Sequence, residues 1–303
     1  MSKPLRLGTR ASPLALWQAH HVADLLRRAV PDLAIEFIHI ETTGDQIRDK
    51  PLSQIGGDGL FTKQIQLAVQ ENRADVAVHS LKDLPTFAVD GLTLAAVPMR
   101  GPTGDAFVSQ RHRSFDTLPI GATVATSSLR RRAQILHRRP DLKLVDMRGN
   151  VETRLRKLEE QNLDATVLAQ AGLERLGLAN VITEILDPAW MLPAVGQGAL
   201  GLECRTADSV TTDLLRLLDH PPTAHAVRAE RAMLRALGGG CQVPIGAKTI
   251  FKDHSLTLCG AVLSPDGSKR IASDISGPLA DSESLGRRLA ETLLQQGAKN
   301  LLK

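Results

Sequence analysis

The sequence has no tyrosine and only six phenylalanines and two tryptophans among its 303 residues. Proteins that bind single-stranded nucleic acid usually stack the bases on aromatic side chains, and the basic clusters of this chain contain none. No apolar run approaches the ~20 residues that span a bilayer. The N-terminal stretch MSKPLRLGTRASPL has no apolar signal core. We therefore predict a cytoplasmic protein that binds neither nucleic acid nor a membrane.

Cysteine is also scarce, with three residues at positions 204, 241 and 259. The chain has no CxxC pair and no Cys/His spacing typical of zinc, so we expect no metal site and a reducing compartment. Cys204 and Cys259 lie in apolar strand patterns and are expected in the sheet core. Cys241 stands in the glycine-rich stretch GGGCQVPIG. Either those glycines simply end a helix, or they give clearance to a group carried by the thiol.

The overall composition is that of a folded, mildly basic protein. Hydrophobic residues make up 43% of the chain, the formal net charge is +4 and the isoelectric point is near 9.1. The length favours two or three domains, and the excess of basic residues favours an anionic partner.

The order of the predicted elements divides the chain into three domains. Strands and helices alternate through residues 1–98, which we assign with 199–218 to a first α/β domain. Residues 103–194 repeat this alternation as a second α/β domain, and the segments GPTG and AVGQG link the two. Residues 221–303 are predicted as a small α+β domain, in which Thr223 caps a helix, Gly238 ends it and SPDGS forms a hairpin turn.

Arginines gather where predicted strands give way to helices. In ATSSLRRRAQ, Ser127 or Ser128 caps a helix whose first turn holds Arg130, Arg131 and Arg132. Cations are unfavourable at a helix N-terminus, so this placement suggests a bound anion. Each arginine alone could instead be solvated surface charge.

Two other junctions share this chemistry. Arg148 precedes Asn150, a plausible cap, with Arg154 a turn further on, and Arg10 lies beside Ser12. Ligands of open α/β sheets bind at this end of the strands. Three such junctions favour a ligand with several anionic groups.

An acidic residue follows another predicted strand, in VAVHSLKDLP. Asp83 at a strand end, beside Lys82, can stay ionised, stabilise a developing cation or transfer a proton. Its alternative role is that of a turn-forming aspartate. His79 is expected to pack at the strand end.

Several of these stretches, in this order, closely resemble the porphobilinogen deaminase family. The matching segments are TRASPLALWQA, GLFTKQIQLA, ADVAVHSLKDLP, DAFVS, TSSLRRRAQ, RGNVETRL, LPAVGQGALGLECR and GGGCQVPIG. The resemblance implies two type II periplasmic-binding-protein-like α/β domains around a cleft and a small α+β C-terminal domain. It implies a monomer, from which we expect transfer of the product to the next enzyme of the pathway.

The resemblance also implies a chemistry. Family members carry a dipyrromethane cofactor on a cysteine through a thioether, here Cys241, and join four porphobilinogen molecules with release of ammonia. Asp83 matches the catalytic aspartate. The cofactor-binding residues implied are Cys241, Lys82, Asp83, Thr126, Ser127, Ser128, Arg130, Arg131, Arg148 and Gly149. The substrate-binding residues implied are Arg10, Ser12, Arg148, Arg154, Arg175, Gln197 and Phe61.

Two positions keep alternatives open. Phe61 either stacks on a pyrrole ring or anchors a helix. Asp58 stands in the GGDGLF loop where the family commonly has lysine, which places the contact of that loop with ligand carboxylates in doubt. The rival functions are a non-catalytic two-domain module that binds a small anion, and an inactive relative with an altered loop.

Overall fold

The structure is a computed structural model that describes residues 3–42, 44, 59–240 and 243–302. Contacts divide the chain into two compact units. The first comprises the described residues of Met1–Asp49, Gly57–Gly101 and Gly198–Ala224, and the second those of Pro102–Gln197 and His225–Lys303. Two of the crossings between units therefore fall inside the predicted linkers GPTG and AVGQG. The exact boundaries of the three domains stay a prediction.

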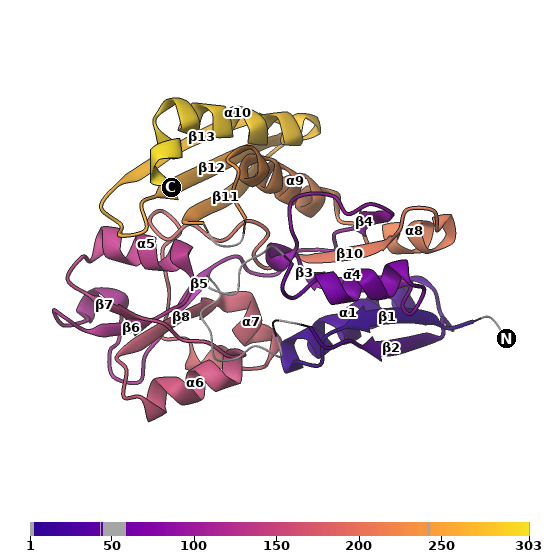
Figure 1. Cartoon of the computed structure of the whole chain (residues 1–303), viewed down its shortest axis with the longest axis horizontal. Coiled ribbons are helices and arrows are strands. Elements are labelled where there is room, and N and C mark those ends of the chain that lie inside the picture. The colour runs from indigo at the N-terminus through magenta and orange to yellow at the C-terminus, as the bar shows by residue number, and fades with distance from the viewer. Residues whose placement is uncertain (1–2, 43, 45–58, 241–242, 303) are drawn as a thin grey trace. The chain divides into compact units, whose positions relative to one another are not determined.

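The first unit is built on one five-stranded sheet (Figure 1), whose strand order is β2-β1-β3-β10-β4. Its strands are β1 (Leu5–Thr9), β2 (Ile35–His39), β3 (Val76–Ser80), β4 (Leu92–Ala96) and β10 (Leu200–Arg205). Its helices are α1 (Pro13–Ala29), α4 (Lys63–Gln70) and α8 (Ser209–Arg216). Strands β1, β2 and β3 are parallel, and β10 is antiparallel to both of its neighbours.

Alternation along the strands places these helices on opposite faces of the sheet. Leu26 of α1 packs in one cluster with Val76 and Val78 of β3, whereas Ile65 of α4 packs in another cluster with Ala77. Successive residues of a strand point to opposite faces. The sheet is therefore covered on both sides, which explains why the central strand β3 is buried along most of its length.

The second α/β sheet repeats the same topology with the order β7-β6-β8-β5-β9. Its strands are β5 (Asp105–Val108), β6 (Thr123–Ala125), β7 (Lys143–Val145), β8 (Ala165–Ala169) and β9 (Glu184–Ile185). Its helices are α5 (Leu129–Arg138), α6 (Val151–Glu160) and α7 (Gln170–Arg175). In each sheet, the strand that follows a crossing from the other unit lies antiparallel beside the three parallel strands. This is the type II periplasmic-binding-protein fold, as predicted.

The C-terminal domain consists of an antiparallel sheet and two helices. It contains β11 (Ile245–Lys252), β12 (Ser255–Leu263), β13 (Arg270–Pro278), α9 (Pro221–Ala236) and α10 (Ser282–Gln295). Helix α10 lies along the sheet (Figure 1), and Leu289 and Leu293 are buried in the same cluster as Leu256 and Leu258. The predicted α+β domain is confirmed.

One predicted helix start in this domain is wrong. Helix α9 begins at Pro221, so Thr223 lies inside it instead of capping it. The ring of His220 takes the capping position, because its Nδ1 lies 3.4 Å from the backbone N of Thr223 and 2.8 Å from its Oγ1.

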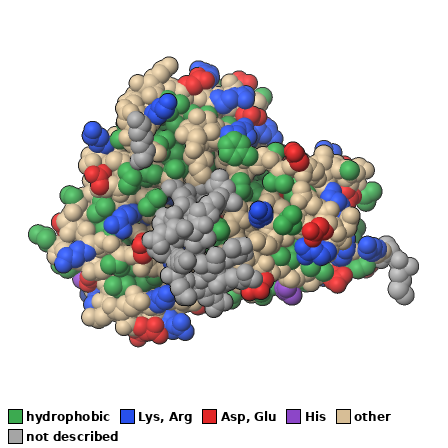
Figure 2. Space-filling model, viewed as in Figure 1, with side chains coloured by type: hydrophobic (Ala, Val, Ile, Leu, Met, Phe, Trp, Pro, Cys, Tyr) green, Lys and Arg blue, Asp and Glu red, His purple; other side chains and the backbone are tan. Residues whose placement is uncertain are grey.

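On the face shown in Figure 2, basic and acidic side chains of the described residues are mixed. Among the described residues, no helix is both long enough and apolar enough to cross a membrane.

Candidate functional site

A cavity of about 100 Å³ lies in the first unit, at the carboxyl ends of β1 and β3. Its lining includes five of the predicted site residues: Arg10, Ser12, Phe61, Lys82 and Asp83. Arg10 directly follows β1, and Lys82 and Asp83 form a 3-10 turn after β3. The parallel pairing of these strands brings their ends together, which is why residues so distant in sequence line one space.

The junction after β1 has the predicted cap. The Ser12 side chain accepts a hydrogen bond from the backbone N of Ala15 at 3.4 Å, and Pro13 opens α1. This cap orders the chain directly beside Arg10.

Phe61 lies under a guanidinium group. The Arg10 Cζ atom is 4.3 Å from the centroid of the Phe61 ring, a cation–π contact. Arg10 is therefore held at the cavity by an aromatic face. The predicted stacking of Phe61 on a pyrrole ring stays a prediction.

A buried carboxylate, Glu203, contacts a residue of the cavity lining and was not predicted from the sequence. Glu203 of β10 lies 3.0 Å from Nε2 of His79 and accepts a hydrogen bond from the Gln66 amide at 2.8 Å. An acidic residue within the apolar run LGLEC was the available signal. His79 is 3% exposed, so the prediction that it packs at the strand end is confirmed.

The serine-rich junction in the second unit starts α5. Ser128 is the cap, and its side chain accepts a hydrogen bond from the backbone N of Arg131 at 3.4 Å. Thr126 Oγ1 accepts from the backbone N of Ser128 at 3.2 Å, and Ser127 bonds the backbone of Met147. The predicted cluster of hydroxyl groups therefore does lie at one helix start.

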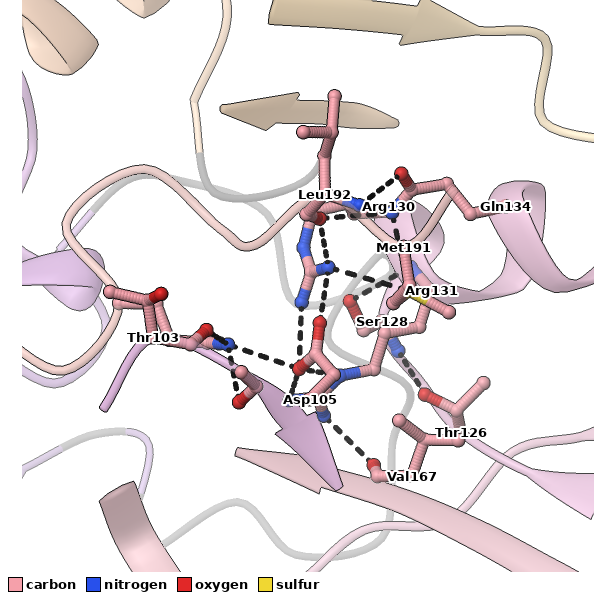
Figure 3. A network of polar contacts seen from close by, with 12 residues as sticks. Thr103, Asp105, Thr126, Ser128, Arg130, Arg131, Gln134, Val167, Met191 and Leu192 are labelled. Atoms are coloured by element: carbon pink, nitrogen blue, oxygen red, sulfur yellow. Dashed lines mark hydrogen bonds and ion pairs between the residues drawn. The ribbon is translucent and has the colours of Figure 1, made fainter. Parts of the chain in front are cut away.

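The anion that explains the neighbouring arginines is in part an internal one (Figure 3). Arg130 contacts Asp105 at 2.6 Å and Arg131 contacts it at 2.7 Å, and both arginines are 5% exposed. The two guanidinium groups hold the pKa of the Asp105 carboxyl well below its usual range, against the opposing effect of burial. The expectation that a bound anion explains the placement of these arginines is therefore corrected in part, because Asp105, a residue of the chain itself, pairs with both.

The next helix start is capped as predicted. The Asn150 side chain accepts from the backbone N of Thr153 at 2.9 Å, and Arg154 Nε donates to the carbonyl of Gly149 at 2.8 Å. Gly149 has φ +126°, and a Cβ there would lie 2.6 Å from the Thr153 side chain, so the turn requires glycine. Arg148 is half-buried at this turn.

Two further predicted residues lie in the second unit. Arg175 ends α7, and burial lowers its pKa to about 10. A cation that loses hydration in this way is stabilised by a nearby anion. Gln197 is buried and donates from its amide to the carbonyls of Thr103 and Gly104 and to Asp105. Its role as a substrate ligand stays a prediction.

The remaining predictions concern the cysteines and the glycine loop. Cys204 is fully buried in β10 and Cys259 is half-buried in β12, and burial raises the pKa of both thiols. Cys241 and Asp58 lie outside the described residues.

The fold favours glycine at the first two positions of GGGCQVPIG. Gly238 has φ +68°, and a Cβ at Gly239 would lie 2.7 Å from Leu234 and 2.9 Å from Ile245. The helix end therefore accounts for these two residues, as one of the two alternatives expected, and clearance for a group on Cys241 stays a prediction.

Comparisons with known proteins agree with the motifs. The family model "Porphobilinogen deaminase, dipyromethane cofactor binding domain" matches residues 5–213, and "Porphobilinogen deaminase, C-terminal domain" matches residues 224–295. The chain is 50% identical to a porphobilinogen deaminase of Pelobacter propionicus over 99% of this chain and 96% of that protein. It is 52% identical to that of Geobacter metallireducens over 99% and 94%.

Solved structures with a similar backbone include the methionine-binding protein MetQ. The TM-score is 0.45 at 12% identity, over 75% of this chain and 94% of that one. We draw no functional conclusion from this likeness.

Proposed function

Because the chain belongs to the porphobilinogen deaminase family, we infer that it is a hydroxymethylbilane synthase. It is a transferase that joins four porphobilinogen molecules head to tail, with one ammonia leaving at each step. Water then releases linear hydroxymethylbilane, and a dipyrromethane primer stays on the protein. The observation that carries this conclusion is the match of both family models, which together take in residues 5–213 and 224–295.

The described residues fit a dipyrromethane, which bears an acetate and a propionate group on each ring. The cavity presents the cationic side chains of Arg10 and Lys82, and the second unit presents a partly desolvated Arg175. When bound, this group supplies the electron-rich pyrrole carbon at which the chain grows. We propose that Cys241 holds it through a thioether.

Asp83 is the proposed catalytic residue. Loss of ammonia from porphobilinogen leaves an electron-poor cation, and an ionised carboxylate beside the pyrrole N–H stabilises it. The same carboxylate can accept the proton that leaves when the new carbon–carbon bond forms. The half-buried position of Asp83 at the cavity supports this role, because reduced solvent screening strengthens the interaction.

The binding roles are proposals of the same kind. Cationic, hydroxyl and amide groups would bind the acetates and propionates of the growing chain through hydrogen bonds to the charged carboxylates. These proposed ligand-binding residues are Arg10, Ser12, Lys82, Thr126, Ser127, Ser128, Arg130, Arg131, Arg148, Gly149, Arg154, Arg175 and Gln197.

The rival function, a non-catalytic module for a small anion, is not supported. Such a module would not account for identities of 50% and 52% to deaminases along nearly the whole chain. The cytoplasmic location, the monomeric state, the transfer of product to a following enzyme, and the absence of nucleic-acid or membrane partners stay predictions from the sequence.

Intact-protein mass spectrometry of freshly purified protein tests the function. We expect a covalent adduct of dipyrromethane size that Cys241→Ser abolishes together with ammonia release from porphobilinogen. Cys259→Ser, which alters a half-buried thiol in β12, is the control and should keep both. An active protein without an adduct would contradict the role of Cys241, and a wild-type protein without ammonia release would contradict the function.

A further inference from the structure

Asp105 forms ion pairs with both Arg130 and Arg131, yet the reaction described above gives it no role. It is the first residue of β5 and is 0% exposed. Arg130 reaches the carboxylate through both Nη atoms, at 2.6 and 3.2 Å. Arg131 reaches it through Nε and Nη2, at 2.9 and 2.7 Å.

Each of the two guanidinium groups also donates a hydrogen bond to a backbone carbonyl (Figure 3). Arg130 also donates to the carbonyl of Leu192 at 2.6 Å, and Arg131 donates to that of Val167 at 2.9 Å. The Gln197 amide donates to Asp105 at 3.1 Å. The carboxylate is thus held from three sides. It in turn orients both guanidinium groups: Arg130 pairs with its two oxygens, and two N–H groups of Arg131 converge on Oδ1.

The charges in this cluster do not cancel. Two guanidinium groups and one carboxylate leave one positive charge, and all three side chains are at most 6% exposed. The cluster also lies at the N-terminus of α5, where the helix dipole adds positive potential. Burial and the charge of Arg130 both lower the pKa of Arg131, against the opposing effect of Asp105. An anion bound beside the pair would relieve this excess.

We propose that Asp105 is a positioning residue: it fixes both guanidinium groups and neutralises one of them, so that the pair binds a single carboxylate of the polypyrrole. This inference rests on the proposed function of Arg130 and Arg131 as ligand-binding residues. Without Asp105, two flexible side chains of like charge would repel each other and lose their common geometry.

Charge and geometry predict opposite results for Asp105→Asn. The substitution removes a negative charge beside a site for anions, so charge alone predicts tighter binding and a lower KM for porphobilinogen. Loss of position predicts weaker binding. We expect a KM at least tenfold higher with a smaller change in kcat, and a lower fraction of folded protein that carries the covalent adduct.

The chain offers a matched control in the first unit. Asp75 also bridges two arginines, contacting Arg6 at 2.7 Å and Arg205 at 2.9 Å. It lies before the start of β3, at the end opposite the cavity. Asp75→Asn should therefore lower the melting temperature while KM and the adduct fraction stay at wild-type values. A purely structural role of Asp105 predicts this same behaviour for Asp105→Asn.

A second variant covers the case in which Asp105→Asn does not fold. Asp105→Glu keeps the charge but moves the carboxylate by one carbon–carbon bond, so it should raise KM at least threefold in folded protein. A wild-type KM in folded Asp105→Asn or Asp105→Glu, or a lower one, would overturn the inference. If the wild-type protein shows neither adduct nor ammonia release, the proposed function itself fails, so the two failures are distinguishable.

Discussion

The charged residues of the candidate site differ in the groups that contact their side chains. Arg130 and Arg131 are fixed by a buried carboxylate, whereas Arg10 lies over the face of Phe61. Asp83 lies in the turn directly after the buried strand β3, and it lines the cavity together with Lys82. A carboxylate that borders open space can approach a substrate, whereas one that is enclosed by arginines serves the protein itself. This contrast separates the catalytic proposal for Asp83 from the positioning proposal for Asp105.

The first prediction concerns Asp83→Asn, which keeps the size of the side chain and removes its charge. The purified variant should retain its fold and its adduct. Ammonia release should fall by about 10²–10⁴-fold, the range expected for loss of an acid–base group. Asp90→Asn, which alters an exposed carboxylate in the same domain, should keep wild-type turnover. Turnover within twofold of wild type in Asp83→Asn would remove Asp83 from the mechanism.

At the scale of elements, local signals predicted the structure well. The caps of α1, α5 and α6 were expected at Ser12, Ser127 or Ser128, and Asn150, and side chains of Ser12, Ser128 and Asn150 do cap them. Such hydrogen bonds join residues only a few positions apart, so their pattern is visible in the chain. The start of α9 was missed because a histidine ring occupies the capping position there.

Partners from distant elements were not predictable in this way. Asp105 lies 25 residues before Arg130, and Gln66 lies 137 residues before Glu203. Only the strand order brings these side chains together. Motifs therefore predicted the cavity residues and the arginine clusters. The carboxylates that contact the arginines and His79 could be identified only in the folded chain.

A second prediction concerns the packing of α10 on α9. A Cβ at Gly286 would lie 2.3 Å from the backbone oxygen of Ala229 and 2.8 Å from the side chain of Ala232. Backbone atoms cannot yield as a flexible side chain does, so the helices must move apart. Gly286→Ala should destabilise the protein by about 1–3 kcal/mol, although alanine itself favours a helix by about 1 kcal/mol.

Chemical denaturation measures this effect. Ser284→Ala, an exposed position on the same helix, is the control and should change the free energy of unfolding by less than about 0.5 kcal/mol. A Gly286→Ala protein as stable as wild type would show that the two helices are not in the close contact described.

At the scale of the whole molecule, the described part of each unit contains an aspartate that joins two arginines, half-buried in the first unit and fully buried in the second. These are Asp75 in the first unit and Asp105 in the second. In both, the arginines hold the pKa of the carboxyl well below its ordinary value. Loss of such a buried partner leaves uncompensated charge, which costs about 3–5 kcal/mol for a fully buried pair.

The last prediction follows from the sign of these shifts. A carboxyl with a lowered folded-state pKa stabilises the fold above its unfolded-state pKa of about 3.9 and loses that contribution as the pH falls toward the folded-state value. Stability should therefore be constant near neutral pH and decline below about pH 4. Asp105→Asn should lower stability at pH 7 and flatten the decline that belongs to the second unit, because its side chain no longer titrates.

The two tryptophans allow this test to be made for each unit separately. Trp17 lies in α1 of the first unit, and Trp190 packs on Phe115 in the second. In urea titrations from pH 7 to pH 2.5, fluorescence of a Trp17→Phe protein should report the effect of Asp105→Asn. A Trp190→Phe protein should report that of Asp75→Asn. Equal shifts of both reporters for both aspartate variants would mean that the two units unfold as one cooperative body. That result would contradict the prediction that each aspartate contributes separately to the acid stability of its own unit.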